Sequence, residues 1–268
     1  MRLAILRVIR KIGAVSVFSR YVALGDSFTE GVGDPYPQSP NGLRGWADRV
    51  ALSLAQMNPE LRYANLAVRG RRMDEILDEQ LQTAVMLEPD LVTIYAGMNN
   101  LLLPRNDVDA MMARYADGLK TLQQTGAVVL TFTAADLGTV PLFRWLRGRA
   151  AVYNELLRGI ADDLDLTLVD FWRYSEFQDS RLWDSDRIHL SPLGHERFAA
   201  RVLDRLAISH ELTSRSAALL SSAPPVRDFR SNLRWTAAFA APWLAKRMRR
   251  AKPGAGMAPK LTTLTKVM

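Results

Sequence analysis

Four short segments of the sequence carry side chains that are common in catalysis. They are Gly25-Asp26-Ser27, residues 65–70 (NLAVRG), residues 97–100 (GMNN) and residues 186–195 (DRIHLSPLGH). A serine hydroxyl becomes a nucleophile when a positioned base removes its proton, and histidine suits that task near neutral pH. A carboxylate on the other ring nitrogen fixes the tautomer of the base. Ser27, His189 and Asp186 therefore form a candidate set for nucleophilic catalysis.

The histidine and the carboxylate of this set are only three residues apart, so a loop or a single turn brings the two side chains together. The chain has three histidines. His195 is the competing base, but it starts a predicted helix that we expect to face away from the strand ends. His210 lies beyond the last strand-end loop. Asp184 is the alternative to Asp186 as the acid.

The elements that position these residues follow from hydrophobic patterning. Short apolar runs predict strands buried on both faces, at Tyr21–Leu24, Tyr63–Val68, Leu91–Tyr95, Ala127–Thr131 and Thr167–Val169. Helical spacing occurs in the segments Trp46–Met57, Met73–Ala84, Met111–Gln124, Ala150–Asp163 and Gly194–Ala207. This alternation predicts an α/β protein, a flavodoxin-like three-layer α/β/α sandwich with a parallel five-stranded sheet in the order 2-1-3-4-5. Ligands bind such sheets at the carboxyl ends of the strands, where the four segments fall.

Together the four segments resemble the SGNH (GDSL) serine hydrolases, over roughly residues 20–208. The resemblance implies that Ser27 is the nucleophile, His189 the base and Asp186 the third member of a triad. It also implies an oxyanion hole made of the backbone N–H groups of Ser27 and Gly70 and the side-chain amide of Asn99. It implies no metal or cofactor.

One residue departs from the family's pattern. The third segment usually ends in aspartate in the family, and here it ends in Asn100. Any role that this carboxylate has elsewhere is therefore changed, and we expect an altered rate rather than an inactive site.

Each candidate residue also has a simpler structural interpretation. Ser27 and Glu30 have the spacing of a helix capping box. Asp26 is expected to orient the turn, Gly70 to end a strand and Asn99 to sit in a turn. These alternatives are local, whereas the four segments occur together at predicted strand ends and in the order of the family that they resemble.

Apolar side chains near the predicted site have two interpretations. Leu142, Phe143 and Trp145 follow the fourth predicted strand, and Leu101 follows the third. They either pack onto the body of the protein or form an apolar lip that contacts the acyl or leaving group of a substrate.

The charge of the chain is divided between its ends and its body. The net charge is +7, but residues 1–20 carry five basic and no acidic side chains, and residues 227–268 carry ten basic and one acidic. The remainder is acidic, which argues against a nucleic-acid partner. No cysteine is present, so disulfides and thiolate metal sites are excluded.

The predicted organisation is a basic lead-in over 1–20, the hydrolase domain over 21–212, a linker over 213–232 and a basic appendage over 233–268. The appendage is expected to be a helix over 233–250 followed by a disordered tail over 252–268. Its helix either docks on the acidic body or lies on an anionic membrane. No window reaches the roughly 20 apolar residues of a membrane span. Arg7, Arg10 and Lys11 interrupt the apolar start, and the first predicted strand follows at once without room for a cleavage site, so we expect a cytoplasmic enzyme.

The predicted function is hydrolysis of a small-molecule carboxylic ester through an acyl-enzyme on Ser27. An O-acyltransferase or a deacetylase acting on a sugar or lipid uses the same triad and stays an alternative. A non-catalytic module that docks on a membrane or partner is the alternative of another class, but it has no need of the catalytic set. The sequence does not indicate the oligomeric state.

Overall fold

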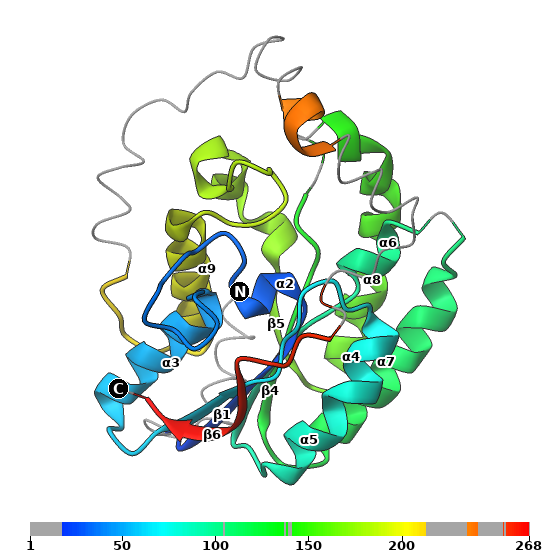
Figure 1. Cartoon of the computed structure of the whole chain (residues 1–268). Helices are drawn as coiled ribbons and strands as arrows, with labels where there is room; N and C mark the ends of the chain where they lie inside the picture. The colour runs from blue at the N-terminus through cyan, green and yellow to red at the C-terminus, as the bar shows by residue number, and fades with distance from the viewer. Residues whose placement is uncertain are drawn as a thin grey trace.

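A mostly parallel sheet of six strands runs through the structure, with helices on both faces (Figure 1). This computed structural model describes residues 18–103, 105–136, 138, 141–212, 235–240, 254 and 256–267. The strands are β1 (Arg20–Gly25), β2 (Arg62–Asn65), β3 (Leu91–Tyr95), β4 (Val128–Phe132), β5 (Thr167–Val169) and β6 (Leu261–Lys266). Their order across the sheet is β5-β4-β3-β1-β2-β6. The α/β fold and the predicted order of the first five strands are confirmed.

The parallel strands are buried because alternate residues enter different cores. On β1, Tyr21 and Ala23 pack in one hydrophobic cluster, and Val22 and Leu24 pack in the other. All four side chains are fully buried. Because alternate side chains point to opposite faces and both faces are buried, all four of these residues are apolar and the sequence shows a continuous apolar run.

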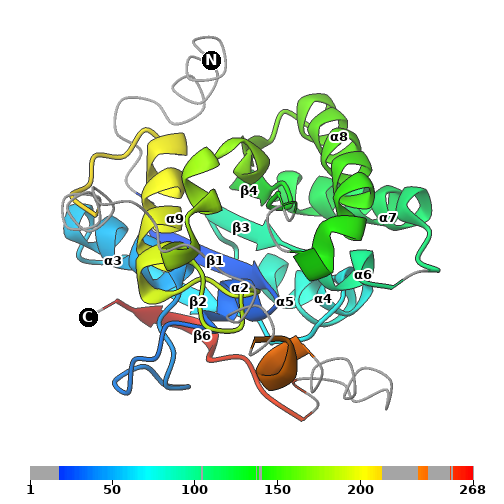
Figure 2. The same cartoon turned by 90° about the horizontal axis from the view of Figure 1, so that it is seen from above.

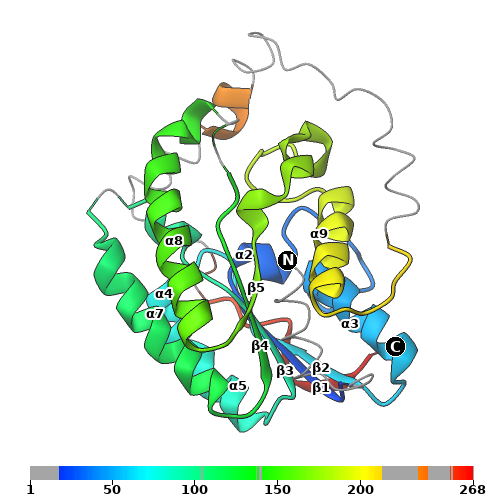
Figure 3. The ribbon, with the colours of Figure 1, turned by 180° about the vertical axis from the view of Figure 1, so that it is seen from behind.

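Two layers of helices cover the sheet, as Figures 1 and 3 show from opposite sides. Helices α3 (Trp46–Met57) and α9 (Pro192–Arg205) lie on one face. The other face is covered by α4 (Met73–Glu79), α5 (Leu81–Met86), α7 (Val108–Gln123) and α8 (Arg147–Asp163). Between the sheet and the first layer, Trp46, Phe132 and Phe198 pack in tilted and edge-to-face arrangements, with ring centroids 5.1–5.6 Å apart.

Short elements surround the carboxyl edge of the sheet, and the candidate residues lie in them or in the loops beside them. They are α2 (Ser27–Glu30), α6 (Met98–Leu101), the 3₁₀ helices η2 (Pro141–Leu146), η3 (Phe171–Arg173), η4 (Ser175–Gln178) and η5 (Ser180–Leu182), and the π-helical turn η6 (Thr236–Ala240). Figure 2 views this edge of the sheet from above.

The end of the chain corrects one prediction. Residues 252–268 were expected to be disordered, but β6 pairs antiparallel with β2 and extends the sheet. The sequence LTTLTK of this strand is rich in β-branched residues, but most of its side chains are exposed. An edge strand of this kind has no buried run of apolar residues, and the sequence pattern therefore did not reveal it.

A buried ion pair ties the same region to the body. Lys260, just before β6, has a side chain that is 1% exposed, and its Nζ lies 2.7 Å from Oδ2 of Asp48 in α3. The same ammonium donates to the backbone carbonyl of Leu43 at 3.1 Å. The positive charge of this part of the appendage therefore meets a carboxylate of the body.

Other predictions fall on residues outside the described ranges. These are most of the lead-in, the linker and all but a few residues of the appendage helix, whose described part is Trp235–Ala240. Among the helices that the structure does describe, none combines the length and the apolar character needed to cross a bilayer.

Candidate active site

Ser27 is presented by a tight turn between β1 and α2. Gly25 ends the strand with φ +152°, and a Cβ there would lie 2.8 Å from the carbonyl oxygen of Tyr95. Only glycine fits that approach. Asp26 is the N-cap of α2, because its Oδ1 accepts the N–H of Phe28 at 3.0 Å. Ser27 is thus the first helical residue rather than the cap, so the capping-box interpretation is wrong.

Glu30, the other half of the expected capping box, has a different partner. Its carboxylate forms an ion pair with Arg69, in which Nη2 lies 2.6 Å from Oε1. It also accepts the backbone N–H of Arg69 at 2.7 Å. This pair fixes the loop after β2, and so the position of Gly70, against α2.

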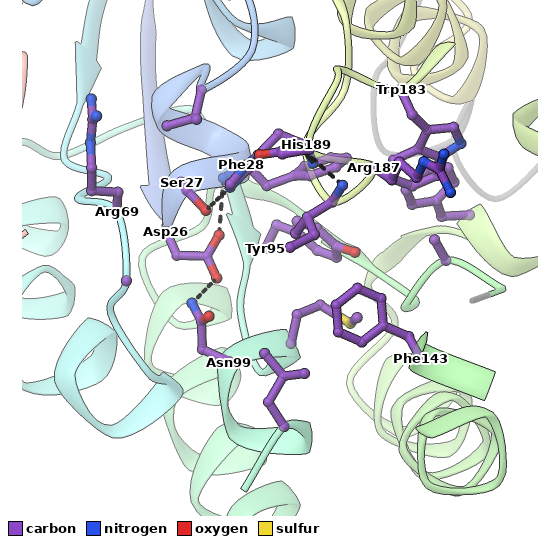
Figure 4. A pocket seen from close by; sticks show the side chains of 18 of the residues that line it. Asp26, Ser27, Phe28, Arg69, Tyr95, Asn99, Phe143, Trp183, Arg187 and His189 are labelled. Atoms are coloured by element: carbon purple, nitrogen blue, oxygen red, sulfur yellow. Dashed lines mark hydrogen bonds and ion pairs between the residues drawn. The ribbon is translucent and has the colours of Figure 1, made fainter. Parts of the chain in front are cut away.

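The histidine, the carboxylate and the serine form one hydrogen-bonded chain (Figure 4). Nδ1 of His189 lies 2.6 Å from Oδ2 of Asp186, and Nε2 lies 2.8 Å from Oγ of Ser27. Oδ1 of Asp186 accepts the backbone N–H groups of Ile188 and His189, both at 2.9 Å. The loop thereby holds the carboxylate beside the ring.

The electrostatics of this chain define the proton positions. Burial raises the pKa of Asp186, but the hydrogen bond and charge of His189 and the backbone N–H groups outweigh it, so the pKa lies below its usual value. An ionised Asp186 accepts from Nδ1–H, which leaves Nε2 with a lone pair for the Ser27 hydroxyl. The carboxylate of Asp184, the alternative acid, instead accepts from Oγ of Ser185 at 3.4 Å.

Two backbone N–H groups at the site have no acceptor in the part of the chain that the structure describes. One belongs to Ser27, at the start of α2, and the other to Gly70, which has φ +79°. Both residues line the cavity in front of the serine hydroxyl. They are available to an oxyanion.

Asn99 lies beside them, and its amide is already engaged. Nδ2 donates to Oδ2 of Asp26 at 2.9 Å and to the carbonyl of Arg71 at 3.0 Å. An incoming oxyanion would therefore share or replace one of these acceptors. Burial raises the pKa of Asp26 to about 6, against the effects of the Phe28 N–H and the charge of His189. Asp26 thus orients the turn, as expected, and also holds the Asn99 amide.

Asn100 has a separate structural task. Its Oδ1 accepts the N–H of Met73 at 2.8 Å, the first N–H of α4, and the residue is buried. The first turn of a helix leaves its N–H groups without intrahelical partners, and a neutral amide oxygen satisfies this one as a carboxylate would. Asparagine therefore keeps the acceptor that aspartate would supply at this position.

The competing histidines have structural partners. His195 is fully buried in α9, and its Nδ1 accepts the N–H of Trp46 at 3.1 Å while its Nε2 donates to the carbonyl of Val32 at 3.1 Å. Burial lowers the pKa of His195 to about 3, so the ring is neutral. Nε2 of His210 lies 3.1 Å from Oδ1 of Asp204. Neither ring lines the cavity around Ser27.

The cavity that contains Ser27 and His189 has a volume of about 410 Å³ and mostly apolar walls. Among the residues of the predicted lip whose side chains the structure describes, only Phe143 lines it. Leu101 is instead fully buried in the core under α6, and Trp145 is 56% exposed and outside the lining. The side chain of Leu142 lies outside the described residues. The prediction that Leu101 belongs to the lip was therefore wrong by one residue, because the next residue, Leu102, lines the cavity.

Trp235 and Ala238 are among the residues at or beside this cavity that the sequence did not indicate. Ala238 lines the cavity, and Trp235 donates from Nε1 to the carbonyl of Asp186 at 3.1 Å. Both are far from the motifs in sequence. An aromatic residue in a segment without a catalytic motif gives no local indication of such a contact.

A parallel α/β sheet with a nucleophile, a base and a carboxylate at its carboxyl edge defines a class of serine hydrolase. The chain belongs to the GDSL-like lipase/acylhydrolase family, whose sequence pattern matches residues 23–197. It is accordingly a serine esterase that acts on ester substrates.

Solved structures show the same fold. An α/β hydrolase from the metagenome of Lake Arreo, Spain, is 23% identical with a TM-score of 0.58, over 72% of this chain and 97% of that one. An acetylxylan esterase from Geobacillus stearothermophilus is 17% identical with a TM-score of 0.57, over 71% and 95%. A lipase/acylhydrolase from Enterococcus faecalis is 22% identical with a TM-score of 0.55, over 70% and 95%. No curated protein is similar enough in sequence to count as a match.

Proposed function

We propose that the protein hydrolyses carboxylic esters through a covalent acyl-enzyme on Ser27. The observation that carries the proposal is the continuous hydrogen-bonded chain from Asp186 through His189 to Oγ of Ser27. His189 removes the hydroxyl proton as Oγ attacks the ester carbonyl, and it returns that proton to the leaving alcohol. Water then attacks the acyl-enzyme by the reverse sequence and releases the acid.

The negative charge on the carbonyl oxygen needs donors that are already in place. The proposal assigns this role to the N–H groups of Ser27 and Gly70 and to the amide of Asn99. The first two have no competing acceptor among the described residues, which supports the assignment. The Asn99 amide must turn partly away from Asp26 or Arg71 when the oxyanion forms, because both of its N–H groups are engaged in the unliganded site.

Covalent labelling tests the nucleophile. The protein should react with a fluorophosphonate probe, and peptide mapping by mass spectrometry should place the adduct on Ser27. Ser27→Ala should abolish labelling and lower p-nitrophenyl ester hydrolysis by at least about 10³-fold, as loss of a triad nucleophile does. A matched control is Ser53→Ala, because that serine lies in the middle of α3 and outside the cavity. An adduct on any other serine contradicts the proposal.

Acyl transfer is the alternative with the same triad. It differs only in the second step, where an alcohol or sugar hydroxyl replaces water. Product analysis separates the two, because hydrolysis gives the free acid and transfer gives a new ester when the acceptor alcohol is added. We expect the free acid as the main product in water.

A further inference from the structure

Residues 235–240 lie beside the catalytic cavity, which Ala238 lines, although they are far from the catalytic motifs in sequence. Figures 1 and 3 both place this segment, drawn in orange, beside η2 and the start of α8. The family pattern ends at residue 197, so the segment lies outside the matched domain. The cavity therefore has one wall that the matched region does not provide.

Trp235 anchors this wall by three different contacts. The residue is 7% exposed and packs in a small apolar cluster with Phe143 and Leu146, which Leu102 and Ile188 border. The indole Nε1–H donates to the carbonyl of Asp186 at 3.1 Å. The guanidinium of Arg187 lies over the ring, with its central carbon 4.7 Å from the centroid. A buried tryptophan with its N–H satisfied is a strong attachment point.

Ala238 follows the anchor by three residues and faces the cavity that contains Ser27 and His189. Leu102, Phe143 and Ile188 line the same cavity and also border or belong to the cluster around Trp235. The wall is thus apolar and joined to the apolar side of the pocket. An aliphatic chain gains by contact with such a surface, whereas an acetyl group is too short to extend along it.

We propose that residues 235–240 are a specificity wall that selects esters by the length of their acyl chain, with Ala238 at the point of contact and Trp235 as its anchor. The preferred substrates are esters of medium-length aliphatic acids rather than acetates. The inference rests on the proposed function, because it presumes an acyl group on Ser27. Ala238 is small, and that small size leaves the room the chain occupies.

The test places a larger side chain at position 238, where it would occupy the space proposed for the acyl chain. Ala238→Trp is compared with the wild type on p-nitrophenyl acetate and p-nitrophenyl octanoate, so that the leaving group stays constant. We expect the ratio of kcat/KM for octanoate to that for acetate to fall at least about tenfold, since one methylene in an apolar pocket is worth 10-fold or more. Ala237→Trp is the matched control, because both alanines are exposed but Ala237 does not line the cavity, and its ratio should equal that of the wild type.

A second variant distinguishes a change in specificity from a loss of folding. Ala238→Leu adds less volume and should lower the same ratio by a smaller factor, and both variants are checked by their melting temperatures. The proposal is overturned if the octanoate-to-acetate ratio of kcat/KM is unchanged in a folded Ala238 variant, or if it falls equally in the Ala237 control.

The labelling of Ser27 separates this inference from the proposed function. If the fluorophosphonate adduct forms on Ser27 and acetate is hydrolysed while the ratio stays fixed, the wall is wrong and the mechanism stands. If neither labelling nor hydrolysis occurs in the wild type, the proposed function fails first and the inference fails with it.

Discussion

Asn99 and Asn100 are adjacent in the sequence, but their side chains serve different parts of the molecule. Asn99 lies in the cavity and donates to Asp26, whereas Asn100 is buried and accepts the first N–H of α4. The motif in which they occur was readable from the sequence because it follows β3 directly. The different roles of the two side chains were not readable from the sequence, because they depend on the direction in which each amide points.

The two residues should therefore respond differently to truncation. Asn99→Ala should lower kcat on an ester by about 10²–10³-fold with KM within a few-fold, as loss of one oxyanion donor does. Asn100→Ala should leave a buried N–H of Met73 without an acceptor and lower the free energy of unfolding by about 1–3 kcal/mol, with kcat largely kept. Asn100→Asp keeps the acceptor and should change the rate by less than about tenfold.

Steady-state kinetics and urea denaturation on the three variants provide the measurement. A silent Asn99→Ala combined with a large loss of kcat in Asn100→Ala would mean that the oxyanion donor had been assigned one residue too early.

At the scale of elements, buried patterns were predictable and contacts between distant elements were not. The bounds of α3, β3 and β5 were predicted correctly, because their apolar spacing reflects burial on one face of a helix or on both faces of a strand. The His195 contact with α3 was invisible in the sequence. There, α9 supplies an acceptor for the first N–H of α3 and a donor for Val32, which lies just after α2.

This contact should make the fold sensitive to acid. The pKa of His195 is about 3 in the folded protein and 6.5 in the unfolded chain, because burial disfavours the charged ring. Between these values the unfolded chain binds a proton at this imidazole and the folded protein does not, so stability falls as the pH falls. The slope from this one group is about 1.4 kcal/mol per pH unit.

His195→Gln isolates this effect, because glutamine offers one acceptor and one donor but does not titrate. The wild type should be the more stable protein at pH 7, and its advantage should shrink by about 3 kcal/mol by pH 4. Urea denaturation of both proteins at several pH values gives the difference, in which the contributions of other groups cancel. A gap that stays constant with pH would show that this imidazole titrates normally in the folded protein.

At the scale of the whole molecule, charge composition left open whether the basic appendage meets the acidic body or an anionic membrane. The structure shows one contact of the appendage with the body, at Lys260 and Asp48. The expected disorder of residues 252–268 was wrong at β6, whose exposed pattern carries little information about an edge strand. Contact of the appendage with an anionic membrane and a cytoplasmic location both stay predictions.

Two lysines of the same region offer a matched comparison. Lys260→Met removes the partner of a carboxylate that is only 15% exposed, and it should lower the free energy of unfolding by about 2–4 kcal/mol. Lys266→Met removes an ion pair with Glu60 in which both side chains are more than half exposed, so its cost should stay below about 1 kcal/mol. Thermal or urea denaturation of the two variants checks the contrast, and equal losses would contradict the burial argument.

The pairing of β6 with β2 also sets an order of events during synthesis. Arg62 is translated long before its partner Lys266, and this contact is among the most distant in the sequence. Contacts of that separation form late, because the loop between them must close first. The five parallel strands and the triad can assemble on the ribosome while the wall at residues 235–240 and strand β6 are still being made. A nascent chain at that stage would hold Ser27 in a pocket that lacks the proposed wall, so the proposed chain-length selectivity would arise later than the nucleophile.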